Sequence, residues 1–308
     1  MPQPTVIQGP AYINRGTLWV YTEDDIILDY KRETWNPKGS ITGMMGERLK
    51  SSHIEISCKP QGEVESLTGY WPFGPTDIGK SIMSATALAI IPLIGNKITF
   101  PRSGVSQMPG LSLAPLNTAW EAMKFICLGD PAVEPTSAAY LQSIAAVGAG
   151  EGSADTHFDQ TKVVSPRYLG TWGAAPFDAL ESESGWQVSP IMETRMMHGA
   201  NHGLLDVILT SLGASASANL INITEAQYAT LMKLQDATAL RPGDTISTVA
   251  DDRDLVITGA RLSVTLKHMG VSEAQLRYGA GTFRQGPVKF VNRRTWTAGA
   301  PDALWTLA

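Results

Sequence analysis

Residues 97–108 read KITFPRSGVSQM, a strand pattern that passes through a Pro/Gly break toward a second extended run at 111–113. The pattern returns at 263–272, SVTLKHMGVS, where ITF of the first stretch becomes VTL and GVS is unchanged. The distance from the strand to the GVS triplet is the same in both places. The chain therefore contains a recurring strand–break–strand unit.

A third match lies further along the chain. Residues 123–126, MKFI, return as 288–291, VKFV, in the same order and at nearly the same spacing. Two copies of a unit are too few for a solenoid, which needs several stacked repeats. The matches predict instead two copies of one domain in tandem.

The composition indicates an ordered chain with room for two cores. The chain has 308 residues, of which 43% are hydrophobic and 17% charged, whereas disorder needs fewer apolar and more charged residues. The longest apolar stretch, 85–94, is too short for a membrane span, and the N-terminus shows no signal-peptide pattern. A net charge of −5 argues against a surface built to neutralise phosphates.

The two cysteines, Cys58 and Cys127, lack the spacing of a metal site. We expect both to be reduced strand residues, with a disulfide between them as the alternative. Trp120 and Trp186 are expected to anchor a core or an interface, and His53 to face solvent from a strand.

Local patterns predict a mainly β, α+β fold with few helices. Strands are expected at 11–21, 26–30 and 53–59, the last because apolar and polar residues alternate there, and 36–52 reads as a long Gly/Ser-rich loop. Helices are expected at 63–70 and at 224–234, where Thr224 and Gln227 form a capping box. The predicted organisation is an arm at 1–10, a first β domain at 11–130, a linker at 131–165 and a second β domain at 166–308.

Residues 74–81, GPTDIGKS, match the GxxxxGKS loop of nucleotide-binding proteins from Gly74 to Ser81. In such a loop, backbone N–H groups and the lysine, here Lys80, hold the phosphates. Pro75 removes one N–H donor, and Asp77 places a carboxylate where a polyphosphate would lie. A loop joining a helix to a strand is the favoured interpretation, although Asp130 could serve as a companion acid for magnesium.

His198 and His202 are four residues apart, which would place both imidazoles on one face of a helix for zinc. They lie in HGANHG, where two glycines and an asparagine disfavour a helix, so an ordinary loop is the favoured interpretation. We therefore assign no catalytic, cofactor-binding or metal-binding residues, and we expect no enzyme activity.

Several short pieces resemble, in their order, the tail tube proteins of long-tailed bacteriophages. The resemblance covers about residues 9–128. The pieces that carry it are Gly9-Pro10-Ala11-Tyr12, residues 54–60, Trp71-Pro72-Phe73, Lys97-Ile98-Thr99-Phe100 and Met108-Pro109. The second half lacks counterparts of Trp71-Pro72 and Met108-Pro109, and resembles the family only through the internal repeat.

The resemblance implies β-sandwich or barrel-like domains, each with a flanking helix, that form rings around a pore. Stacked rings would make the tail tube of a virion, with the loop 36–52 reaching the next ring. Three chains carrying two domains each would give a pseudo-sixfold ring. The implied partners are other copies of the chain, other tail proteins and genomic DNA that passes through the lumen without specific binding, but no membrane. Acidic residues within 23–33 and 55–65 are candidates for the lumen wall.

The same resemblance implies that the protein is made in the host cytoplasm and resides in the phage tail. Two other functions stay open at this point. One is another structural role in the virion, such as a baseplate hub, a tail terminator or a capsid decoration. The other is nucleotide binding through residues 74–81.

Overall fold

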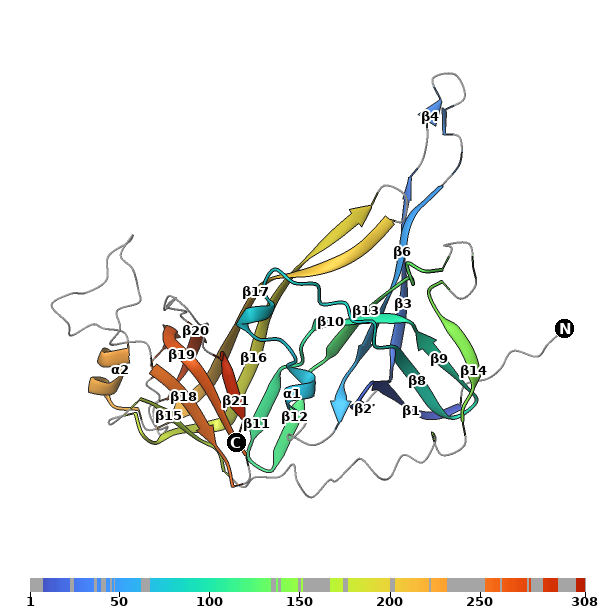
Figure 1. Ribbon diagram of the computed structural model, residues 1–308. Helices are drawn as coiled ribbons and strands as arrows, with labels where there is room; N and C mark the ends of the chain where they lie inside the picture. Colours follow the sequence, from blue (N-terminus) through green and yellow to red (C-terminus); the bar gives the residue numbers. More distant parts are fainter. Residues whose placement is uncertain are drawn as a thin grey trace.

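The protein is described from a computed structural model that is mainly β, as the sequence predicts. The ladders between the described strands are all antiparallel. The structure describes residues 8–22, 25–35, 38–39, 43–44, 46, 48–61, 67–133, 137, 140–148, 151, 167–173, 177–199, 203–221, 223–231, 253–260, 262–275, 277, 285–292 and 303–307. Strands of the first half lie on the right in Figure 1, and most strands of the second half lie on the left.

The first half forms two sheets. One has the order β14-β9-β8-β1-β2-β7 and the other the order β10-β13-β6-β3. The strands of the first sheet are β1 (Gln8–Arg15), β2 (Leu18–Thr22), β7 (Pro60–Gln61), β8 (Leu88–Ile94), β9 (Asn96–Phe100) and β14 (Ser143–Ala146). Those of the second are β3 (Ile27–Trp35), β6 (Arg48–Cys58), β10 (Arg102–Gln107) and β13 (Met123–Leu128).

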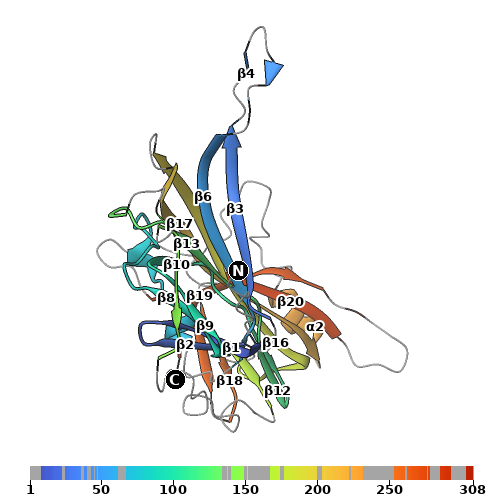
Figure 2. The same ribbon diagram turned by 90° about the vertical axis from the view of Figure 1, so that its right-hand side faces the viewer.

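Four further short elements belong to the first half. Strands β4 (Lys38–Gly39) and β5 (Gly43–Met44) pair at the far end of the hairpin formed by β3 and β6. This hairpin extends beyond the rest of the molecule, with β4 at its end (Figures 1 and 2). The helix α1 (Leu67–Tyr70) and the 3-10 turn η2 (Pro75–Asp77) lie between β7 and β8.

In the second half, six strands close into a barrel in the order β16-β15-β18-β19-β20-β17, because β16 also pairs with β17. Strand β21 pairs with β19. The helix α2 (Glu225–Leu231) follows β17. The strands are β15 (Leu169–Trp172), β16 (Leu180–Gly199), β17 (Gly203–Ile221), β18 (Arg253–Thr258), β19 (Ser263–Ala274), β20 (Gln285–Asn292) and β21 (Trp305–Leu307).

The sequence repeat coincides with two ladders that have the same register. Strands β10 and β13 pair as β19 and β20 do, and both ladders contain a β-bulge at the same place. The pairs are Gly104–Ile126, Val105–Phe125 and Gln107–Lys124 in the first half, and Gly270–Val291, Val271–Phe290 and Glu273–Lys289 in the second.

The correspondence extends to the two long hairpins, β3–β6 and β16–β17. Each hairpin has an irregularity directly after a Glu in a Glu-Thr pair, at Glu33 and at Glu193. Each reaches a pair of glycines at its far end, Gly39–Gly43 and Gly199–Gly203. Four further residue pairs of the first half have a counterpart in the second half. With the first-half pair given first, they are Ile27–Ser57 and Gln187–Ser217, Thr22–Pro60 and Ser182–Leu220, Arg15–Leu88 and Trp172–Leu255, and Ile98–Ile144 and Val264–Leu307.

One difference between the halves has a local cause. Pro101 separates β9 from β10, because proline lacks the N–H that would continue a ladder. The corresponding part of β19 runs through without a break, with His268 at a φ of +56°. The first half is also interrupted between β2 and β3 and between β6 and β7, where β16 and β17 of the second half are continuous. With these breaks, the first half forms two sheets and the second half one barrel.

Some sequence predictions need correction. The stretch 11–21 is not one strand but the hairpin β1–β2, which turns at Gly16 with a φ of +63°. The predicted loop 36–52 ends early, because β6 already begins at Arg48. The predicted linker 131–165 contains β14, which pairs with β9. Strand β14 was missed because it is short and exposed, and its partner β9 lies far earlier in the sequence.

The expectations about buried strand residues, tryptophans and cysteines agree with the structure. Ile54, Ile56 and Cys58 are buried along β6, as the alternation predicts, and Trp120 and Trp186 are also buried. Cys58 and Cys127 are free thiols, and burial raises the pKa of both to about 12. No helix in the part of the chain that the structure describes is long and apolar enough to cross a bilayer.

The capping box of α2 is formed as the sequence predicts. The backbone N–H of Thr224 donates to Gln227 Oε1 at 2.9 Å, and the N–H of Gln227 donates to Thr224 Oγ1 at 3.2 Å. A Thr224→Ala variant is expected to lose about 1 kcal/mol of unfolding free energy, measured by chemical denaturation. Thr230→Ala, in the exposed body of the same helix, is the control and should change stability much less. Equal losses in both variants would contradict a capping role.

Candidate assembly interface

The two halves meet where the hairpin β16–β17 lies against the first half (Figure 1). Three groups of contacts form this junction. A hairpin of the first half extends the barrel at β16, a loop of the first half pairs with β17, and the end of the β16–β17 hairpin contacts β6. We call these contacts together the intramolecular junction.

The first contact adds the hairpin β11–β12 (Leu111–Ala114 and Asn117–Trp120) to the edge of β16. Leu111 pairs with Val188, and Leu113 with Trp186. All four side chains are buried. Next to them, Gly185 has a φ of +92°, and a Cβ built on it would lie 2.3 Å from the carbonyl oxygen of Leu113. The close approach of strand β11 to strand β16 therefore requires glycine at position 185.

The second contact pairs residues 79–82 with β17. The N–H of Gly79 donates to Leu209 O at 2.7 Å, and the N–H of Leu209 donates to Lys80 O at 3.0 Å. One step along, the N–H of Ile82 donates to Val207 O at 2.9 Å. These bonds frame an apolar cluster that joins the halves, formed by Ile82, Ile126 and Leu128 with Leu204, Val207 and Leu209.

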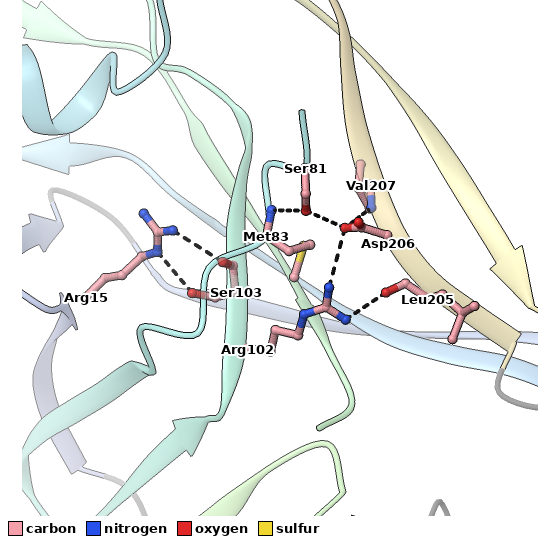
Figure 3. Close-up of polar contacts among 8 residues, drawn as sticks. All are labelled: Arg15, Ser81, Met83, Arg102, Ser103, Leu205, Asp206 and Val207. Atoms are coloured by element: carbon pink, nitrogen blue, oxygen red, sulfur yellow. Dashed lines mark hydrogen bonds and ion pairs between the residues drawn. The ribbon is translucent and has the colours of Figure 1, made fainter. Parts of the chain in front are cut away.

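A polar network at the edge of this cluster centres on Asp206 (Figure 3). Ser81 Oγ donates to Asp206 Oδ1 at 2.5 Å and accepts from the N–H of Met83 at 3.0 Å. Arg102 donates to Leu205 O at 2.7 Å and lies 3.5 Å from Asp206 Oδ1. Side chains of the first half thus donate hydrogen bonds to a backbone carbonyl of β17 and to the carboxylate of Asp206.

The third contact joins the two long hairpins. A Cβ on Gly203, whose φ is +68°, would lie 2.5 Å from Ser51 Cβ. His198 Nδ1 lies 3.9 Å from Glu33 Oε2. Glu33 also accepts from Lys50 at 2.7 Å and from Ser51 at 3.0 Å, and these hydrogen bonds lower its pKa. Glu33 is therefore held as a carboxylate facing the end of the second hairpin.

The structure gives the GxxxxGKS sequence a role in this junction. Asp77 Oδ2 accepts from the N–H of Gly74 at 2.9 Å, and Asp77 Oδ1 lies 3.3 Å from Lys80 Nζ. The N–H of Gly79 is bonded to β17, and Ser81 to Asp206. Donors that would hold phosphates in a nucleotide site thus have protein acceptors here. Sequence reasoning missed this strand-pairing role, because nothing in the loop itself indicates a partner in β17.

His53 and His198 do not lie as the sequence suggests. His198 lies in β16 rather than in a loop, and His202 lies outside the described residues. No group of three His, Cys, Asp or Glu side chains that could hold a metal occurs among the described residues. The side chain of His53 is only 14% exposed, not solvent-facing, and burial lowers its pKa. His53 lines a groove between the strands β3 and β6 and residues 137 and 140–142.

The junction covers a surface of β17 in the second half, and the corresponding surface of β6 in the first half is exposed. Leu49 occupies in β6 the register position of Leu209 in β17, opposite Thr34 and Thr194 respectively. Leu209 is 0% exposed and Leu49 is 61% exposed. Strand β3 is the edge strand of its sheet, and its residues Ile27 and Trp35 are also exposed. An open groove of about 480 Å³ lies here, lined by Glu33, Thr34, Trp35, Leu49 and Lys50.

Comparison with known proteins adds no identity. No protein-family model matches the chain, and no curated protein sequence matches it significantly. Function must therefore be inferred from the intramolecular junction and from the exposed edge of the first half.

Proposed function

We propose that the chain is a structural virion protein that self-assembles into stacked rings, which form the tail tube of a long-tailed bacteriophage. The resemblance of residues 9–128 to tail tube proteins supports this proposal. The matching ladders support its second element, two tandem tail-tube-type domains at 11–130 and 166–308. On this proposal the chain has no catalytic activity.

The observation that carries the proposal is the contrast between Leu209 and Leu49. The first half covers β17 of the second half, but among the residues that the structure describes nothing equivalent covers Leu49 on β6. An interface that joins different surfaces of two like units can be repeated head to tail, and it forms a ring when the rotation closes. Three chains would supply six such units, which gives a homotrimer with pseudo-sixfold symmetry.

The charge of the chain suits a conduit for DNA. The net charge is −5, and Asp25 and Asp29 are exposed at or just before β3. Carboxylates on the inner wall of a tube would repel phosphates and let DNA slide, whereas lysine and arginine would hold it. The DNA would therefore pass during infection without specific binding.

Negative-stain microscopy of the purified protein tests the proposal. Tubes or stacked rings with a central channel are the expected result, with mass measurement giving three chains per ring. Dispersed monomers over the micromolar range would overturn self-assembly. Rings of six chains would still agree with a tail tube, but they would contradict a ring of three chains with pseudo-sixfold symmetry. Isolated rings that never stack would point to another role in the virion, such as a tail terminator.

A further inference from the structure

The ends of the two long hairpins correspond residue by residue. Gly39 pairs with Gly43 as Gly199 pairs with Gly203. One step down each hairpin, Lys38 pairs with Met44 as His198 pairs with Leu204. Lys38 therefore holds the register position in the first hairpin that His198 holds in the second.

The carboxylate that faces the histidine has a counterpart as well. Glu33 pairs with Ser51 directly before the irregularity in the β3–β6 ladder, and Glu193 pairs with Ser211 directly before that in the β16–β17 ladder. Within the chain, His198 of the second half faces Glu33 of the first half at 3.9 Å. Repetition of the junction between two chains would bring Lys38 of one copy to Glu193 of another.

The charges fit this arrangement. Beside Glu33, Lys50 of the neighbouring strand donates to the carboxylate at 2.7 Å. The position of Lys50 in β6 corresponds to Thr210 in β17, which carries no charge. Glu193 is exposed, and a lysine from outside its own hairpin would complement it.

We propose that the β3–β6 hairpin of one chain lies on the second half of a second copy and repeats the intramolecular junction there. Lys38 of one copy pairs with Glu193 of the other, and the second copy covers the apolar surface around Leu49. This inference rests on the proposed function, because it assigns the contact through which the rings close. It also fixes the polarity, with the first half of each chain joined to the second half of the next.

A charge exchange tests the pairing. Lys38→Glu and Glu193→Lys are each expected to raise the concentration needed for ring formation about tenfold or more, because each places like charges together at every subunit contact. The double variant should recover most of the loss. Concentration-dependent light scattering and sedimentation velocity measure the effect, with circular dichroism to show that each variant keeps the β content of the parent.

A crosslink provides a second readout. Lys38→Cys and Glu193→Cys in one chain should give intermolecular disulfides under mild oxidation, and the two native thiols are buried. Each single cysteine variant is the control and should give no such product. The largest covalent species is expected to contain three chains.

The outcomes separate this inference from the proposed function. If the protein forms rings, but the double variant gains nothing over the single variants and the cysteines do not crosslink, the Lys38–Glu193 contact is wrong and the tail tube proposal stands. If the parent protein forms no assembly at any concentration, both are overturned. Recovery by the double variant together with a crosslink supports both.

Discussion

A Leu209→Ala variant is expected to lose about 2 to 5 kcal/mol of unfolding free energy, because the truncation leaves a cavity in the cluster that joins the halves. Leu209 is 0% exposed and packs in the cluster with Ile82 and Ile126. Its two backbone hydrogen bonds to residues 79 and 80 are kept by alanine, so the measured loss reports the side chain alone. Denaturant unfolding of dispersed subunits measures it.

Leu49→Ala provides the matched control, because it makes the same chemical change at the corresponding register position. Leu49 is 61% exposed in the chain, so the stability of the dispersed subunit should change by less than about 0.5 kcal/mol. The same variant should weaken ring formation, since assembly is expected to bury Leu49 as the junction buries Leu209. Similar losses of subunit stability in both variants would contradict the difference in burial on which the proposed function rests.

Gly185→Ala is expected to have the second large effect, about 2 to 5 kcal/mol. The φ of +92° disfavours any side chain, and the added Cβ would meet Leu113 O at 2.3 Å and Ala114 Cα at 2.6 Å. Backbone cannot move away as a flexible side chain can, so β11 would have to separate from β16. Hydrogen exchange at β11 should rise more than exchange at β1, which lies in another sheet.

Gly79→Ala separates the two causes. Gly79 has a similar φ of +87°, but a Cβ there would have no atom within 4 Å. This variant should show only the cost of the backbone conformation, about 1 to 2 kcal/mol. The difference between the two glycine variants then measures the close approach of β11 to Gly185. A loss at Gly79 as large as that at Gly185 would show that the contact with Leu113 contributes nothing.

Several features could be predicted because their signals are local. The alternation at 53–59 specifies the strand of Ile54 and Ile56, and the spacing of Thr224 and Gln227 specifies the start of α2. The repeat of GVS and of the KF pair marks two ladders with one register. The correspondence of the long hairpins was missed, because GSITG at 39–43 and GANHG at 199–203 share little beyond their glycines.

The sequence by itself determined a mainly β chain and the repeat that matches ladders in both halves. Only the tertiary structure decided the fate of the two leucines, Leu49 and Leu209. They are the same residue at the same register, so no local pattern can distinguish them. Their exposure depends on which distant segment packs against each one, and residues 79–82 lie on β17 but not on β6. Burial is a property of the completed packing, and this is why the interface was visible only in three dimensions.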